Sequence, residues 1–280
     1  MNALEIKDLS KSFKGFKLDN LNLTLPSGCI MGLIGENGAG KSTTIKLILN
    51  MLHKESGTVT VLGKDNSENI TLLKEDIGVV MDEAGIPACL TVKQVGKIMK
   101  NTFRQWDKGE YDRLIKKLSL PENKPFKDFS RGMKMKLGIA IAMSHGAKLL
   151  ILDEPTSGLD PVVRDEVVEM FYDFTRDENH SILISSHIVS DLEKLCDYIA
   201  FLHKGKLLLC EEKDELLSEY GMIHCIPEKL SELDGIKIKY KKETPYGTTL
   251  MVSRKNIPDT IKVSPISIEE LFLFMVKEER

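Results

Sequence analysis

The chain has 280 residues, and 39 lysines and arginines against 42 aspartates and glutamates give it a formal net charge of −3. This length predicts one medium-sized α/β domain with a small appendage. The charge balance provides no strong positive field, so we expect no binding to nucleic acid by phosphate neutralisation. The five cysteines form no C-x-x-C pair, which argues against a disulfide framework or zinc site and is typical of a reducing cytosol.

The first third of the chain predicts strands. Apolar residues alternate around positions 4–6 and 21–25, which predicts an early antiparallel sheet, and residues 29–34 read as a buried strand. The N-terminus lacks the basic and apolar regions of a signal peptide, and no stretch approaches the apolar length that crosses a bilayer. If the protein works at a membrane, we expect a partner to span it.

A glycine-rich loop follows the strand at 29–34. Its glycines allow successive backbone N–H groups to face phosphate oxygens, Lys41 can reach β and γ phosphates, and Ser42 can place its hydroxyl on Mg²⁺. The helix predicted behind the loop adds its positive N-terminal end. The loop therefore predicts binding of a nucleoside triphosphate by Gly35, Glu36, Asn37, Gly38, Ala39, Gly40, Lys41, Ser42 and Thr43.

Two carboxylates end a later apolar strand. Residues 86–144 are predicted to be mostly helical, with breaks at Gly109, Pro121 and Pro125, and a strand is predicted at 148–152. Asp153 and Glu154 follow directly. Beside a phosphate loop, Asp153 can hold Mg²⁺ through water and Glu154 can polarise the attacking water. The alternative is an acidic cap at the end of the strand.

The last predicted core strands are at 181–185 and 198–210, the second being a pair that turns at Lys204 and Gly205. His187 follows the first of them, where it can hydrogen-bond a γ phosphate or be an ordinary surface residue. Residues 211–220 read as a charged helix or linker, and we expect the core to end near residue 210. Residues 221–280 predict a small αβ appendage with an amphipathic stretch at 268–276.

Over residues 1–210 the chain resembles the ATP-binding subunit of ABC transporters. The resemblance implies a P-loop NTPase fold of ABC type, with a mixed core sheet, an antiparallel β-subdomain, a helical subdomain inserted at about 86–144 and a C-terminal αβ accessory region at 211–280. It implies ATP and Mg²⁺ as ligands, Glu154 as catalytic base and His187 as switch histidine. It also implies a D-loop containing Ser157 and Asp160, and stacking of adenine on Phe13, with Phe16 as a rival.

The resemblance is imperfect at two places. The family signature corresponds here to Ser130, Arg131, Gly132 and Met133, with Arg131 where a second glycine is usual and a helix expected from Met135. By the resemblance these residues contact ATP held by a second subunit, and Arg131 either adds charge to that contact or faces solvent. Asp82 replaces the usual Gln, so it is either a third metal ligand beside Ser42 and Asp153 or a solvated turn residue.

The resemblance further implies an ATPase that acts as a dimer, either homodimeric or heterodimeric, on the cytoplasmic face of the membrane. Its partner is a separate transmembrane permease subunit, which we expect to dock near residues 82–105. The variant signature and the appendage most resemble exporters of drugs, antimicrobial peptides or amphipathic peptides. An ABC importer ATPase and a non-transport regulatory ABC ATPase are the alternatives.

Overall fold

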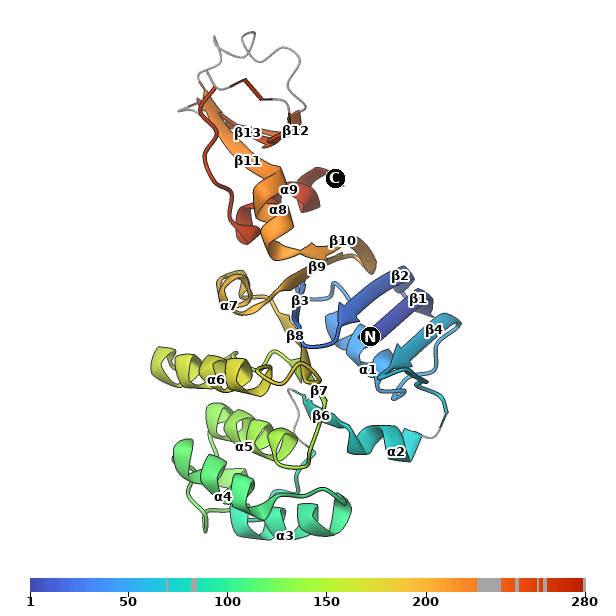
Figure 1. The fold of residues 1–280 in the computed structure, drawn as a ribbon, viewed down its shortest axis with the longest axis vertical. Coiled ribbons are helices and arrows are strands. Elements are labelled where there is room, and N and C mark those ends of the chain that lie inside the picture. The colour runs from blue at the N-terminus through green and yellow to red at the C-terminus, as the bar shows by residue number, and fades with distance from the viewer. Residues whose placement is uncertain are drawn as a thin grey trace.

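The structure, a computed structural model, describes residues 1–68, 70–81, 85–225, 238–244, 247–255, 257–258 and 261–278. In this part of the chain the strands form sheets of four, six and three strands. Figure 1 shows the six-stranded sheet in the middle, the helices α3 to α5 at one end of the molecule and the three-stranded sheet at the other. The predicted α/β architecture with antiparallel and mixed sheets is confirmed.

The central sheet is mixed, with the strand order β10-β9-β3-β8-β7-β6. All neighbouring pairs are parallel except β9 and β10, which form an antiparallel hairpin at the edge. The strand β6 at the opposite edge was not predicted. The strands are β3 (Ile30–Ile34), β6 (Ile77–Val80), β7 (Leu149–Asp153), β8 (Ser181–Ser186), β9 (Tyr198–His203) and β10 (Lys206–Glu212).

Alternate residues of the central strands point into two separate cores. Ile30 and Ile34 of β3 belong to a hydrophobic cluster shared with the helices that follow β6, β7 and β8. Met31 and Leu33 belong to a second cluster, shared with the antiparallel sheet and the first helix. Successive side chains of a strand point to opposite faces, so a strand covered on both sides is apolar throughout. Every residue of β3, β7 and β8 is accordingly buried.

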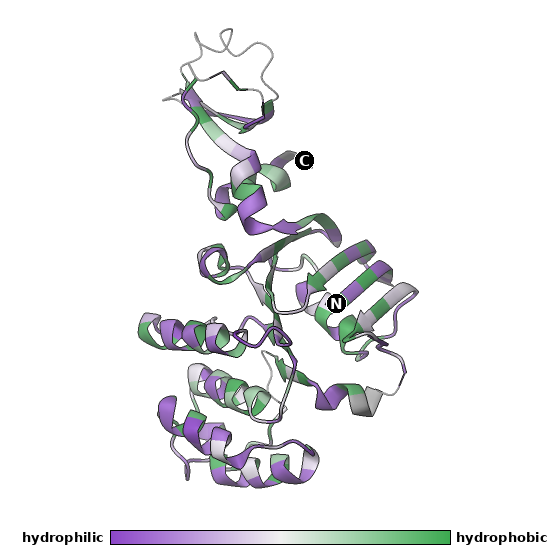
Figure 2. Ribbon diagram, viewed as in Figure 1, coloured by the Kyte–Doolittle hydropathy of each residue, from purple (hydrophilic) through white to green (hydrophobic). Residues whose placement is uncertain are grey.

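The antiparallel sheet has the order β2-β1-β4-β5 and contains both predicted early strands. Figure 2 shows its strands striped by alternating hydrophobic and hydrophilic residues, as expected for a sheet with one face packed and one exposed. The sequence patterns did not predict β4 and β5. The elements are β1 (Asn2–Phe13), β2 (Phe16–Pro26), β4 (Ser56–Val61) and β5 (Lys64–Asp65), with α1 (Lys41–Ile48) and α2 (Ile70–Glu75) connecting to the central sheet.

The helical region contains α3 (Val92–Thr102), α4 (Lys108–Lys117), a 3-10 turn (Phe126–Asp128) and α5 (Arg131–Met143). Two sequence expectations were wrong here. Gly109 does not break a helix but lies in the first turn of α4, which the Asp107 side chain caps by accepting from the Glu110 N–H. The helix expected from Met135 begins at Arg131, because Ser130 caps it by accepting from the Met133 N–H.

Two helices follow the strand ends of β7 and β8. These are α6 (Pro161–Phe174) and α7 (Val189–Leu195). Along the part of the chain that the structure describes, no helix combines the length and the apolar character needed to span a bilayer.

The C-terminal unit comprises α8 (Lys213–Glu219), the sheet β11-β13-β12 and α9 (Ile268–Glu278). Its strands are β11 (Tyr220–Cys225), β12 (Ile238–Thr244) and β13 (Gly247–Ser253). Because β10 continues to Glu212, the core sheet ends two residues later than expected, and the division of the chain into domains stays a prediction.

The helix α9 joins this unit to the central sheet. Phe272 packs edge-on against Phe201 of β9, with ring centroids 5.1 Å apart, and Phe274 packs against Tyr240 of β12 at 4.9 Å. Residues two apart point to roughly opposite sides of a helix. The two phenylalanines therefore bind α9 to both sheets.

Candidate nucleotide-binding and catalytic site

The phosphate loop connects β3 to α1 and turns at its glycines. Gly38 and Gly40 have φ angles of 83° and 113°, a region that favours glycine. A Cβ at Gly35 would lie 2.5 Å from the carbonyl oxygen of Leu202, so a side chain would clash with the backbone there. The helix begins at Lys41, directly after the loop, and directs its N-terminal end toward it.

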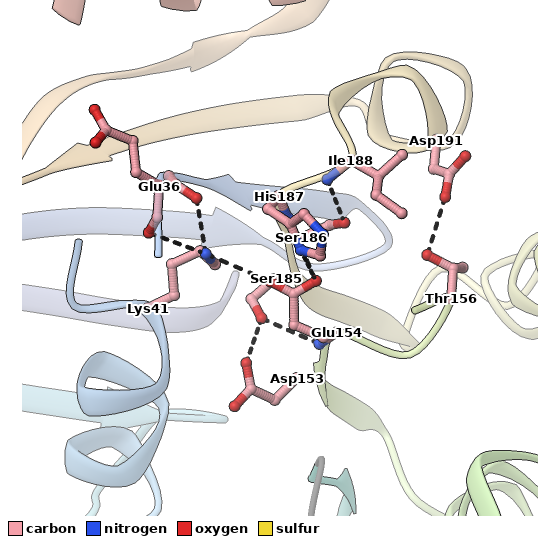
Figure 3. Close-up of polar contacts among 11 residues, drawn as sticks. Glu36, Lys41, Asp153, Glu154, Thr156, Ser185, Ser186, His187, Ile188 and Asp191 are labelled. Carbon is pink, nitrogen blue, oxygen red and sulfur yellow. Dashed lines mark hydrogen bonds and ion pairs between the residues drawn. The ribbon is translucent and has the colours of Figure 1, made fainter. Parts of the chain in front are cut away.

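Lys41 is the buried cation of this loop, with only 6% of its surface exposed. Its ammonium donates to the carbonyl oxygens of Gly35 at 2.7 Å and Glu36 at 3.4 Å. It also lies 3.4 Å from a carboxylate oxygen of Glu154 (Figure 3). A buried charge needs such partners, and all three contacts are of the kind that phosphate oxygens can replace.

One residue of β8 contacts both predicted acids at the end of β7. The Ser185 hydroxyl donates to the Asp153 carboxylate at 2.5 Å, and the Glu154 N–H donates to the Ser185 carbonyl at 3.1 Å. Asp153 is 4% exposed and Glu154 is half-buried. Glu154 has a φ of 54°, a left-handed conformation that is strained for a residue other than glycine.

His187 completes a cluster at the strand ends. Its Nδ1 lies 2.7 Å from a carboxylate oxygen of Glu154, whose other oxygen faces Lys41 (Figure 3). Lys41, Glu154 and His187 follow β3, β7 and β8, which are neighbours in the sheet. We name these three residues the strand-end cluster. Ligands of open α/β sheets bind at the carboxyl ends of the strands, where this cluster lies.

The signature segment and the D-loop lie against each other within the chain. A Cβ at Gly132 would lie 3.2 Å from Leu159, and a Cβ at Gly158 would lie 3.5 Å from the Arg131 side chain. Ser130 and Arg131 are exposed and Met133 is half-buried. Their predicted contact with a second subunit's ATP stays a prediction.

Both D-loop residues form hydrogen bonds within the chain. The Asp160 side chain accepts a hydrogen bond from the Val163 N–H at 3.1 Å and caps α6. Ser157 is half-buried, and its N–H donates to the Glu154 carbonyl at 3.1 Å. The predicted roles of both residues between subunits stay predictions.

The two candidate aromatic residues differ in exposure. Phe13, at the end of β1, is 42% exposed. Phe16 is partly buried, and its ring would lie 2.9 Å from a Cβ at Gly40, so it packs against the phosphate loop. The rings are 6.3 Å apart. This geometry favours Phe13 as the ring with a free face, and its contact with adenine stays a prediction.

Two of the three predicted metal ligands lie among the described residues. Ser42 is exposed at the start of α1, and Asp153 lies at the end of β7. Asp82 lies outside the described residues, as does the neighbouring Glu83. Among the residues described, no group of three or more His, Cys, Asp or Glu side chains is arranged to hold a metal. A carboxylate and a hydroxyl fit Mg²⁺, which uses few protein ligands together with substrate phosphates.

Three polar residues around the site had no predicted role. Besides Ser185, these are Thr156, whose hydroxyl donates to the Asp191 carboxylate of α7 at 3.0 Å, and His203, whose Nδ1 lies 3.0 Å from a Glu36 carboxylate oxygen. Ser185 and His203 are both buried, within the strands β8 and β9. A buried polar side chain needs a polar partner, which is the signal that identifies both.

A family model described as ABC transporter matches residues 18–157. The ABC transporter ATP-binding protein YhcH of Bacillus subtilis is 30% identical, over 99% of this chain and 97% of its own. The lantibiotic transport ATP-binding protein SrtF of Streptococcus pyogenes is 39% identical, over 75% of this chain and 91% of its own. The bacitracin transport ATP-binding protein BcrA of Bacillus licheniformis is 36% identical, over 73% of this chain and 68% of its own.

A solved structure of an ATP-binding subunit of an ABC transporter is also similar. It superposes with a TM-score of 0.70 at 27% identity and covers 76% of this chain and 91% of its own. The matched share of this chain corresponds in extent to the core without the C-terminal unit.

Proposed function

Because this chain belongs to the ABC transporter family and is its ATP-hydrolysing subunit, we propose that it powers the export of drugs, antimicrobial peptides or amphipathic peptides through a separate transmembrane subunit. The convergence of Lys41, Glu154 and His187 at the strand ends carries the catalytic part of the proposal. The names of the lantibiotic and bacitracin transport relatives support the class of cargo.

Each residue of the strand-end cluster has a chemical task in this proposal. Lys41 exchanges its contacts with Glu154 and the loop carbonyls for oxygens of the β and γ phosphates. The Glu154 carboxylate, released from Lys41, accepts a proton from the attacking water as general base, while the water oxygen bonds to the γ phosphorus and ADP leaves. His187, 2.7 Å from that carboxylate, keeps it oriented and would hydrogen-bond the γ phosphate.

Ser42 and Asp153 would hold Mg²⁺, which neutralises charge on the phosphates when it is bound. The Ser185 hydroxyl keeps Asp153 oriented from the neighbouring strand. The hydroxyl of Ser42 is exposed at the first turn of α1, on the side of the phosphate loop. Both oxygens therefore suit a cation that arrives with the nucleotide.

A second ATP-binding subunit would complete the site. The exposed Ser130, together with Arg131, Gly132 and Met133, begins α5, a helix of 13 residues. The N-terminal end of such a helix attracts phosphate. In a head-to-tail dimer this end would face the ATP held by the phosphate loop of the other subunit.

This subunit would lie at the cytoplasmic face of the membrane, bound to the transmembrane subunit, for which a groove between β6, α3 and α5 is suited. The groove has a volume of about 290 Å³ and is lined by apolar residues of β6, α3 and α5, among them Val79, Met99 and Met135. We name it the coupling groove. Gly85, Ile86 and Met99 in its lining fall within the expected docking region at 82–105. Arg131 also lines it, so the same residue borders the groove and the signature.

Transport direction can be tested in inside-out membrane vesicles. The chain is co-expressed with the membrane subunit encoded beside it, and ATP is added outside with a fluorescent lantibiotic peptide. An exporter accumulates the peptide in the vesicle lumen, and the Glu154→Gln variant does not. ATP-dependent release of preloaded peptide would show an importer instead. ATP hydrolysis without any movement of peptide, drug or lipid would favour a regulatory ATPase.

A further inference from the structure

A second groove lies between α3 and α4, on the other side of α3 from the coupling groove. It has a volume of about 900 Å³. None of its lining residues belongs to the coupling groove or the strand-end cluster. Its lining contains five lysines, namely Lys93, Lys97, Lys100, Lys108 and Lys116, and we name it the lysine groove.

The floor of the lysine groove is apolar and held in place. Trp106 and Tyr111 lie with ring centroids 5.0 Å apart, and the Tyr111 hydroxyl donates to the Val92 carbonyl at 3.0 Å. A Cβ at Gly96 would lie 2.7 Å from the Tyr111 ring, so α3 approaches this ring closely. Tyr111 itself is buried, so the half-buried Trp106 beside it gives the groove a preformed surface for an apolar side chain.

The rim of the groove is positive although the whole chain is negative. Its five lysines exceed its two carboxylates, Asp112 and Glu122, by three charges, whereas the chain carries −3. Lys93 pairs with Glu122 at 2.9 Å, and Lys108 pairs with Asp112. Within the described residues, the remaining three lysines have no ion-pair partner. In Figure 2 hydrophilic residues recur along the ribbons of α3 and α4, between hydrophobic ones.

We propose that the lysine groove binds an acidic amphipathic helix of a partner protein. The helices that line it have 11 and 10 residues, about 15 Å of length, which suits a partner helix of two to three turns. Apolar residues of that helix would cover the half-buried Trp106, and its carboxylates would pair with Lys97, Lys100 and Lys116. The apolar floor favours a polypeptide over a phosphate group alone, because phosphate leaves the exposed part of Trp106 uncovered.

The position of the groove makes it a second docking site beside the first. Met99 lines the coupling groove while Lys97 and Lys100 line the lysine groove, so one helix separates the two. A helix is about 10 Å across. A partner seated in the coupling groove would therefore have its neighbouring segments within reach of the lysine groove. The proposal goes beyond the proposed function, since it depends on neither hydrolysis nor transport direction.

The only tryptophan of the chain, Trp106, reports on this groove directly. The probe is a 14-residue peptide of glutamate and leucine at helical spacing, without aromatic residues, titrated into the full chain. We expect a saturable blue shift of Trp106 emission, and affinity that falls several-fold as NaCl rises from about 0.05 to about 0.5 M. No shift up to about 1 mM peptide would overturn the proposal.

Variants distinguish the groove from general charge effects. Lys97→Glu/Lys100→Glu/Lys116→Glu should weaken peptide binding at least about tenfold, and the milder Gln triple variant should weaken it less. Lys7→Glu/Lys64→Glu/Lys242→Glu has the same charge change at exposed sites outside the groove and should bind as the parent does. Circular dichroism checks that each variant folds.

Three other results would reject the acidic helix. One is equal affinity in the groove triple variants and the parent, and another is equal binding of a peptide with lysine in place of glutamate. The third is a Trp106 shift with phosphatidylglycerol vesicles or pyrophosphate but none with the acidic peptide, which would assign the groove to a membrane surface or a phosphate.

Discussion

The strand-end cluster and the α9 contact are built on the same central sheet from opposite kinds of interaction. At the ends of β3, β7 and β8, three charged or titratable side chains contact one another at 2.7 to 3.4 Å. At β9, Phe201 meets Phe272 through apolar packing alone. The residues that serve the chemistry are therefore separate from those that stabilise the fold here. Changes at the strand ends should alter turnover and leave the fold intact. Changes under α9 should lower the stability of the fold and leave the site unchanged.

Glu154→Gln should give the largest effect and the sharpest separation. The amide keeps the size of the side chain but cannot accept a proton from water, so hydrolysis should fall by about 10² to 10⁴. ATP binding should persist, because Lys41 and the loop are unchanged, and ATP should then trap a dimer. Steady-state hydrolysis and light scattering with and without ATP measure both effects.

The matched control for this variant is Glu169→Gln, an exposed residue of α6. It should hydrolyse ATP at the parent rate. Near-parent turnover in Glu154→Gln itself would remove this residue from the role of general base.

Phe272→Ala should have the next largest effect, and on stability alone. It removes a ring that is 8% exposed and packed on Phe201, so the free energy of unfolding should fall by about 3 kcal/mol. ATP affinity should change by less than about twofold, because the residue does not touch the strand-end cluster. Denaturant unfolding and nucleotide titration test the two parts.

The neighbouring Leu273→Ala serves as its control. Leu273 is 49% exposed, so its removal should cost less than about 0.5 kcal/mol. Equal destabilisation by the two variants would mean that α9 does not pack on β9 through Phe272.

Lys41→Ala should weaken ATP binding at least about tenfold, which is about 1.4 kcal/mol. The variant loses a charge-assisted contact to the β and γ phosphates. The loop should keep its conformation, because its glycines set the turns. The control is Lys46→Ala, which removes the same charge from a half-buried residue of the same helix. It should bind ATP like the parent. Equal ATP affinity in all three proteins would count against the phosphate loop as the nucleotide site.

The strand-end residues could be predicted because each chemical group is local in sequence. A phosphate loop is contiguous, and two carboxylates that end an apolar strand stand out from their neighbours. Their meeting with His187 also follows from the rule that parallel strands end at one edge. The contact between Phe272 and Phe201 joins residues 71 positions apart through ordinary apolar packing. No local pattern identifies which phenylalanines of an amphipathic helix will meet, so this contact required the structure.

The start of α5 and the strand β6 were missed for different physical reasons. Ser130 caps α5 through one hydrogen bond to Met133, and the polar residues of its first turn hide its helical character in the sequence. The strand β6 is only four residues long at the edge of the sheet. Short edge strands have too few residues to show a period.

Thr156→Val tests whether the two regions are as separate as the comparison states, and its effect should be the smallest. The Thr156 hydroxyl, 1% exposed, donates to Asp191 of α7, and α7 also packs against α9. Losing this hydrogen bond should cost about 1 kcal/mol, because Asp191 keeps a second partner in Arg164 at 3.5 Å. Turnover should fall no more than a few-fold.

The decisive measurement is the unfolding free energy of the Thr156→Val/Phe272→Ala double variant. If the regions are independent, its loss of unfolding free energy equals the sum of the single losses within about 0.5 kcal/mol. A larger departure would show that α7 couples the C-terminal unit energetically to the loop after Glu154. The two regions would then not be independent.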